Sequence, residues 1–201
     1  MPSLHQRTLQ RRVEISGVGL HSGQQVRLSI SPAAPGSGLI FQRSDLPGKV
    51  EIPARVENVV DTRFATTLGV TEEGQTFTIG TVEHLLSALA GLGIDNARIE
   101  VDGPEVPILD GSAAPFVFTL RGGGIRQQSA FKRFLMLRRT VEVRDGEKHA
   151  RLSPSRTFRI TCSIDFDHPL IGRQKLRFEF SDRDYHREIS RARTFGFLAE
   201  V

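Results

Sequence analysis

The first 80 residues alternate between apolar and polar positions in a way that predicts β-strands. Residues 13–15 and 26–30 each carry apolar side chains at every second position, and glycine-rich residues separate the two runs. A Pro/Gly/Ser loop follows at 32–38. Further strand-like stretches lie at 39–41, 50–59, 64–70 and 76–79. This part of the chain is therefore predicted to be mainly β, and to begin with two strands of a β-meander.

The pattern changes from a period of two to helical spacing after residue 80. Four apolar residues between Val82 and Leu89 fall at i, i+3, i+4 and i+7, which is the spacing of one apolar helix face. Thr81 is the predicted N-cap, and Gly91 or Gly93 the predicted end. A strand is expected at 97–101 and a second short helix at 113–120.

Residues 121–130 are polar and lose all periodicity, which makes them the best candidate for a domain boundary. We therefore expect a first α+β domain at 1–122, a linker at 123–130 and a second α+β domain at 131–201. Strand-like stretches resume in this last part, at 134–143, 149–152, 158–166 and 176–180.

A faint internal repeat links the two expected domains. Residues 11–15 followed by 26–29 are echoed by residues 139–143 followed by 150–153. The echo suggests two copies of one α+β motif, with the helices of each copy after its strands. The helix of the second copy would start near Phe197, so this copy is expected to be truncated. The predicted fold class is α+β.

Composition indicates an ordinary folded protein and restricts the choice of metal ligands. Hydrophobic residues make up 38% and charged residues 25%, both close to globular averages. No apolar run reaches 18 residues and the N-terminus lacks the apolar core of a signal peptide, so we expect a cytoplasmic protein without an integral membrane segment. The single Cys162 excludes an internal disulfide and a cysteine-based zinc site. Any metal must be held by His, Asp or Glu.

The positive net charge does not point to nucleic acid. The formal charge is +4, from 27 Lys plus Arg against 23 Asp plus Glu. Nucleic-acid binding needs positive charge gathered on one face, whereas the arginines here are spread along the chain among acidic residues. We therefore expect no nucleic-acid partner.

The most informative local feature is a carboxylate beside an imidazole in the first turn of the predicted helix, at Glu83 and His84. Adjacent helix residues point about 100° apart, so the two do not chelate one metal together. They can divide the work if His84 binds a metal and Glu83 takes a proton from the metal-bound water. The alternative, favoured by spacing alone, is that the helix dipole favours Glu83 and that His84 is a partly buried polar residue.

A catalytic zinc site needs about three protein ligands and an open position. None of the other five histidines forms a ligand pair by spacing. His21 lies in a glycine-rich turn, and His168 precedes Pro169, so turn or extended conformations explain both without a metal. Spacing therefore does not complete a site around His84.

Residues 190–197 combine two arginines, a hydroxyl and two aromatic rings around a glycine. The hydroxyl of Thr194 can stabilise an oxyanion. Packing at the start of a helix is the other interpretation, and these residues alone favour it.

Five motifs in order give the chain a resemblance to one family, the UDP-3-O-acyl-N-acetylglucosamine deacetylases of lipid A synthesis. The resemblance runs through essentially all 201 residues. It is carried by residues 17–23, 81–84 continued through 88–96, 110–116, 164–169 and 189–197. It implies two similar β-sheet-plus-helix domains packed as a sandwich, in a monomer. It also implies zinc-dependent loss of acetate from the 2-acetamido group of the UDP-sugar.

The resemblance also implies roles for individual residues. Glu83 would be the general base and His84 the first Zn²⁺ ligand, while Thr194 would stabilise the oxyanion. Phe195 would pack near the sugar. The nucleotide pocket would be lined by three further residues: Lys148, Asp165 and Phe166, with Phe166 stacked on uracil and Asp165 bonded to its edge.

The family's remaining zinc ligands would follow Val201, in a His-Lys-x-x-Asp segment, together with a histidine that acts as general acid. We therefore expect this chain to bind zinc weakly and to lack measurable deacetylase activity. The alternative function is a non-catalytic fragment that binds a UDP-sugar.

Overall fold

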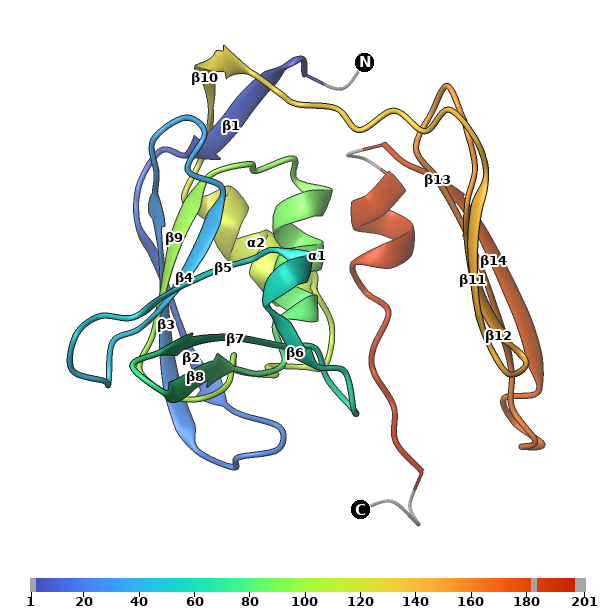
Figure 1. Cartoon of the computed structure of the whole chain (residues 1–201), viewed down its shortest axis with the longest axis horizontal. Helices are drawn as coiled ribbons and strands as arrows, with labels where there is room; N and C mark the ends of the chain where they lie inside the picture. Colours follow the sequence, from blue (N-terminus) through green and yellow to red (C-terminus); the bar gives the residue numbers. More distant parts are fainter. Residues whose placement is uncertain (1–2, 182–183, 198–201) are drawn as a thin grey trace. The chain divides into compact units, whose positions relative to one another are not determined.

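Strands dominate the structure, a computed structural model that describes residues 3–181 and 184–197 (Figure 1). The chain divides into two compact units, one formed by residues 1–132 with 185–201 and the other by residues 133–184. The described residues form a mixed α+β structure that is rich in strands and has few helices. None of these helices has the length and apolar character needed to cross a membrane.

The first unit is built on a five-stranded sheet in the order β2-β3-β9-β4-β5. All neighbours are antiparallel except β4 and β9, which are parallel. The strands are β2 (Val13–Val18), β3 (Gln25–Pro32), β9 (Ala97–Val101), β4 (Leu39–Arg43) and β5 (Glu51–Pro53). The two runs of period two pair with each other, Val13 opposite Ile30 and Ile15 opposite Leu28, which confirms the predicted first pair of strands.

Two helices, α1 (Glu83–Gly91) and α2 (Ala114–Gly122), lie on the same face of this sheet (Figure 1). Nine residues are too few for a stable isolated helix, so tertiary packing must hold each one. The side chains between sheet and helices are fully buried, and each contributes about 1.5–3 kcal/mol by leaving water. They include Phe41, Ile99, Leu85, Leu89, Phe116 and Leu120.

The predicted C-terminal end of α1 is confirmed, but its predicted N-cap is wrong. The helix ends at Gly91, and Gly93 takes the left-handed conformation with φ of 64°. Val82 rather than Thr81 is the N-cap, and no side chain caps the helix. The hydroxyl of Thr81 instead donates a hydrogen bond to the buried carboxylate of Glu105.

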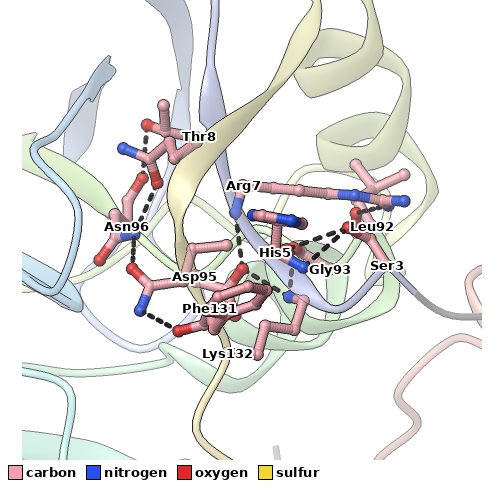
Figure 2. Close-up of polar contacts among 12 residues, drawn as sticks. Ser3, His5, Arg7, Thr8, Leu92, Gly93, Asp95, Asn96, Phe131 and Lys132 are labelled. Atoms are coloured by element: carbon pink, nitrogen blue, oxygen red, sulfur yellow. Dashed lines mark hydrogen bonds and ion pairs between the residues drawn. The ribbon is translucent and has the colours of Figure 1, made fainter.

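A polar cluster surrounds the C-terminal end of α1 and ties it to the pair β1 (His5–Leu9) and β10 (Ile125–Phe131) (Figure 2). The side chains of Arg7 and Lys132 donate to the carbonyls of Leu92 and Gly93, which follow the helix. The carboxylate of Asp95 accepts the Arg7 N–H at 2.7 Å and Lys132 Nζ at 2.5 Å. The helix end therefore has partners from β1 and from the residue that follows β10.

Asn96, next in the sequence and only 1% exposed, joins the same cluster to the loop before β4. Its amide oxygen accepts the Gly38 N–H at 2.8 Å, and its amide nitrogen donates to the side-chain oxygens of Gln6 and Gln128. The Thr8 hydroxyl donates to its carbonyl at 2.7 Å. One side chain thus connects four separate segments.

The first unit is completed by a three-stranded sheet in the order β6-β7-β8. Its strands are β6 (Val59–Asp61), β7 (Thr67–Glu72) and β8 (Gln75–Ile79), and a 3₁₀ turn at Val56–Asn58 precedes them. Strand β10 occupies most of segment 123–130, where the sequence predicts a linker. Only Gln128 of this strand is buried, so no apolar alternation marks it. The division of the chain into domains stays a prediction.

The second unit consists of two antiparallel hairpins. One joins β11 (Val141–Asp145) to β12 (Lys148–Leu152), and the other joins β13 (Arg159–Asp165) to β14 (Arg173–Glu179). The strand expected from residue 134 begins only at Val141. Apolar side chains such as Val143 and Leu152 are exposed at 68% and 60%. Unlike the first unit, these strands do not enclose a core of their own.

Candidate functional site

Glu83 is the first residue of α1, and the backbone of Thr66 fixes its carboxylate. The Thr66 N–H donates to Glu83 Oε2 at 2.9 Å, and the Thr66 carbonyl accepts the N–H of Val82 at 3.3 Å. Glu83 is half-buried, as is His84 on the next position of the turn. The N-terminus of a helix presents unpaired N–H groups and a partial positive charge, so it favours the ionised carboxylate and any developing negative charge nearby.

Thr81, two residues before Glu83, holds a strained backbone. It is 2% exposed and has φ of 55°, a left-handed conformation that is a clear outlier for a β-branched residue. Such strain costs on the order of 1–3 kcal/mol and persists only where the surroundings enforce it. The Thr81 hydroxyl donates to Glu105 Oε1 at 2.7 Å, and this hydrogen bond is one of the enforcing contacts.

Glu105 is 4% exposed and gathers donors from two segments. Besides the Thr81 hydroxyl, it accepts the backbone N–H groups of His21, at 3.1 Å, and Ser22, at 2.9 Å. Burial by itself raises the pKa of Glu105, but the hydrogen bonds from Thr81, Ser22 and His21 together outweigh it and leave the pKa below its ordinary value. The carboxylate is therefore ionised at neutral pH and acts as an acceptor only.

The turn between β2 and β3 fits closely against this carboxylate because Gly19 has no side chain. A Cβ at Gly19 would lie 2.5 Å from Glu105 Oε2 and would also clash with Ser22 Oγ. The turn is closed by the Gly23 N–H, which donates to the Gly19 carbonyl at 3.1 Å. Glycine is therefore required at position 19 for His21 and Ser22 to reach Glu105.

The loop between β9 and α2 contacts residues near the predicted catalytic groups at both of its ends. Near its beginning it carries Glu105, which bonds to Thr81. Near its end the Gly111 carbonyl accepts the N–H of Thr194 at 2.9 Å. Asp110 lies 3.6 Å from Arg193. This loop is thus the scaffold shared by the N-terminus of α1 and the segment that carries Thr194.

Asp110 is itself fixed within the loop. Its carboxylate accepts the Ser112 N–H at 3.0 Å and the Ser112 hydroxyl at 2.8 Å. Partial burial raises the pKa of Asp110, but these two bonds and the charge of Arg193 lower it overall. The ionised carboxylate can therefore attract Arg193 and help to hold the segment before Thr194.

A second anchor holds the segment before Thr194 on α1. Tyr185 begins a π-helix at Tyr185–Ile189 and is 4% exposed. Its hydroxyl shares a hydrogen bond with Ser87 of α1 at 2.7 Å. Its ring packs on Gly91, where any Cβ would clash with it. Burial raises the pKa of Tyr185 and outweighs the lowering effect of the Ser87 hydrogen bond.

A surface cavity of about 390 Å³ lies beside Thr81 and Glu105. Its lining includes His21, Arg63 and Phe64, the last of which is 84% exposed with φ of 60°. None of the predicted catalytic or substrate-binding residues lines it. The cavity therefore places an imidazole, a guanidinium and an aromatic ring around a carboxylate that sequence analysis did not single out.

The other predicted residues have the following positions. Thr194 is exposed, and Phe195 is 56% exposed and packs edge-on against Phe197 at 5.8 Å between ring centroids. The remaining three belong to the second unit: Lys148 on β12, Asp165 at the end of β13, and Phe166, whose N–H donates to Gly172 at 3.1 Å. The structure thus links the start of α1 and the segment of Thr194 through one loop, and the roles of all these residues stay predictions.

The described residues do not by themselves fit a complete zinc site. Among residues 3–181 and 184–197, no group of three or more His, Cys, Asp or Glu side chains is arranged to hold a metal ion. A catalytic zinc needs about three such ligands. His84 is therefore not part of a three-ligand group within the described part of the chain.

Glu105 is the residue that sequence analysis missed. It stands in the Pro/Gly-rich stretch 102–107, and nothing in local periodicity separates a buried glutamate there from a solvated one. The sequence does offer one signal of burial near Glu105, because apolar residues follow it. The first of them, Val106, is fully buried in the structure.

Comparison with known proteins identifies the family. The family described as LpxC, UDP-3-O-acyl N-acetylglycosamine deacetylase, matches residues 6–201. A UDP-3-O-acyl-N-acetylglucosamine deacetylase of Myxococcus xanthus is 56% identical over 99% of this chain and 62% of its own length. Those of Shewanella sp. (strain W3-18-1) and Shewanella oneidensis are 52% and 51% identical over 98% of this chain and 64% of theirs. The chain spans a little under two thirds of these relatives, and it belongs to the LpxC deacetylase family.

Proposed function

We propose that this chain is the part of a UDP-3-O-acyl-N-acetylglucosamine deacetylase that carries the general base and the first metal ligand. The reaction is hydrolysis of the 2-acetamido group with release of acetate, in the cytoplasm, as a step of lipid A synthesis. The observation that carries the proposal is Glu83, whose carboxylate is held by the Thr66 N–H at the N-terminus of α1 with His84 beside it. Membership of the family supports it.

In this proposal each residue of the first unit has a defined task. Glu83 accepts a proton from the attacking water while the oxygen of that water bonds to the amide carbon. The hydroxyl of Thr194 donates to the oxyanion of the tetrahedral intermediate. His84 would be one ligand of Zn²⁺, which would supply Lewis-acid activation of the amide carbonyl and of the attacking water. Phe195 packs near the sugar.

The second unit carries the proposed nucleotide pocket. Phe166 stacks on the uracil ring, Asp165 accepts a hydrogen bond from its edge, and Lys148 supplies positive charge. Phe166 follows a regular strand and its N–H is bonded to Gly172, so its backbone is fixed as a stacking platform requires. The partner is a small molecule; we propose a monomer without nucleic-acid partners.

We further propose that the chain contains two related α+β domains, the second incomplete. Both stretches of the internal echo form antiparallel pairs, β2 with β3 and β11 with β12. The pairing differs by two residues, because Ile15 lies opposite Leu28 whereas Val143 lies opposite Ala150. A shift of two keeps the same side chains on the same face, so it is compatible with a common origin.

The alternative is a non-catalytic fragment that binds a UDP-sugar. The observation that favours it is the lack of a three-ligand group among the described residues. The two functions differ in a measurable way, because a binding fragment retains UDP without turning over substrate.

The test compares the 201-residue chain with a protein that carries it at the length of its relatives. We expect no measurable acetate release from the 201-residue chain, because a single ligand does not hold catalytic zinc. We expect turnover from the longer protein, reduced by about 10²–10⁴-fold by Glu83→Gln because general-base catalysis is lost. Glu73→Gln, on an exposed turn, is the matched control and should leave turnover unchanged. Zinc-dependent turnover by the 201-residue chain, lost on Glu83→Gln, would overturn its assignment as an incomplete site.

A further inference from the structure

We infer that Glu105 and Thr81 are positioning residues for the proposed deacetylation: their hydrogen bond fixes the direction in which α1 begins and so places Glu83. This inference rests on the proposed function, since it assigns a role in that reaction to two residues outside the proposed set. Neither residue is proposed to touch the reacting atoms.

A short chain of contacts leads from Glu105 to Glu83. Glu105 accepts the Thr81 hydroxyl at 2.7 Å. Val82, next in sequence, donates its N–H to the Thr66 carbonyl at 3.3 Å, and the Thr66 N–H returns to Glu83 Oε2 at 2.9 Å. A rotation of the backbone at Thr81 therefore changes both contacts made by Thr66.

The backbone of Thr81 needs an external restraint to keep its conformation. Its φ of 55° is disfavoured for a β-branched residue, so the backbone relaxes toward negative φ when the restraint is removed. Val82 has ordinary helical angles and no side chain caps the helix, so no cap holds the bend at the start of α1. The Glu105 carboxylate supplies the restraint from a buried position.

The Thr81–Glu105 hydrogen bond can be removed without loosening the backbone around it, so positioning of α1 can be separated from the stability of the fold. The backbone around the pair is held independently, because the Gly80 N–H donates to Pro104 at 2.9 Å and the Val106 N–H donates to Gly80 at 3.0 Å. Loss of the Thr81 hydroxyl leaves these two bonds in place. Its effect is therefore expected at the start of α1 rather than across the sheet.

The carboxylate of Glu105 also holds the turn of His21 and Ser22. That turn and Thr81 both line the 390 Å³ cavity. Glu105 thus fixes the cavity wall relative to the N-terminus of α1. A single buried acceptor thus holds together two segments, at Thr81 and at His21, that lie about sixty residues apart in the sequence.

The direct test is amide hydrogen exchange on the 201-residue chain, which needs no catalytic activity. In Thr81→Val we expect the Thr66 and Val82 amides to exchange at least about 10-fold faster, because their bonds open locally. The His21 and Ser22 amides should change less than about 3-fold, since Glu105 still accepts them. Thr71→Val, which removes an exposed hydroxyl contact with Thr76, is the matched control.

Glu105→Gln is the second variant, because it keeps the size of the side chain and removes its charge. We expect faster exchange at His21, Ser22 and Thr66 together, since the amide offers one acceptor oxygen in place of two. Exchange at Thr66 that is unchanged in both variants would overturn the inference and leave Glu105 as a support of the turn alone.

The kinetic test uses the protein at the length of its relatives. We expect Thr81→Val to lower kcat by about 10–100-fold with KM within about 2-fold, because misplacement of the base affects the transition state more than binding. Thr81→Ser, which restores the hydroxyl, should recover kcat to within about 3-fold of wild type. An unchanged kcat in Thr81→Val would refute positioning. If wild type itself shows no turnover, the proposed function fails, while hydrogen exchange still decides whether Thr81 places Glu83.

Discussion

The two ends of α1 are held in opposite ways. At the C-terminal end, the carbonyls of Leu92 and Gly93 accept Arg7 and Lys132, and left-handed backbone is taken by a glycine. At the N-terminal end, no side chain caps the helix, and left-handed backbone is taken by a buried threonine.

The difference fits the proposed function, in which the C-terminal end secures the helix and the N-terminal end carries the proposed base and first metal ligand. Strained residues and uncapped helix starts reduce stability, and they persist in proteins mainly at functional sites. The N-terminal end leaves backbone N–H groups uncapped, and Thr81, just before the helix, lines a surface cavity. The C-terminal cluster in Figure 2 compensates, because it ties the helix to strands from both ends of the first unit.

The largest effect on stability is expected from Asn96→Ala in the C-terminal cluster. Loss of its amide leaves the Gly38 N–H and the side chains of Gln6 and Gln128 without their partner, so we expect about 3 kcal/mol less free energy of unfolding. Urea denaturation measures this. Asn58→Ala, which removes a single bond to Pro53, should cost about 1 kcal/mol. An equal loss in the two variants would contradict the role of Asn96 as the connection between segments.

A smaller effect is expected from Asp95→Asn. This change removes the charge opposite Lys132, in a pair whose side chains are 16% and 28% exposed, and we expect a loss of about 1–2 kcal/mol. High salt should weaken the effect only slightly, because partly buried pairs are screened less than exposed ones. The exposed pair Asp61–Arg63 is the control, and Asp61→Asn should leave urea denaturation unchanged. Equal losses would show that burial does not distinguish the two pairs.

The smallest effect is expected at the N-terminal end, as a change in pH dependence. The pKa of Glu105 is lowered in the folded protein, so its contribution is present above the unfolded pKa of about 4.3 and is lost as pH falls through the folded value. Glu105→Gln should therefore show a shallower loss of stability than wild type as pH falls below about 4.3, measured by urea midpoints. Glu73→Gln should keep the wild-type slope. Parallel curves for wild type and Glu105→Gln would contradict the folded-state shift.

Much of the fold was predictable because its signals are local. The alternation in β2 and β3 and the i, i+3, i+4, i+7 spacing of α1 come directly from which side chains face the core. Gly91 and Gly93 marked the helix end correctly. Strand β10 escaped prediction because it is held by backbone pairing with β1, over 100 residues earlier, and buries almost no apolar side chain.

The candidate site was predictable only in part. Glu83 and His84 could be singled out because a carboxylate and an imidazole at a helix start suggest chemistry, and the five motifs led to the family that the comparisons establish. The conformation of Thr81 could not be foreseen. Threonine before a helix ordinarily caps it by accepting a backbone N–H, whereas the Thr81 hydroxyl donates to a carboxylate 24 residues away in the sequence.

The sequence by itself determined most of the strand and helix pattern of the first unit, the family, and the identity of the proposed base and first ligand. Only the tertiary structure decided that Glu105 holds Thr81 and the turn of His21, and that Asn96 joins four segments. The physical reason is that hydrogen bonds between residues far apart in the chain follow no period. They depend on which groups the packed sheet and helices bring within bonding distance.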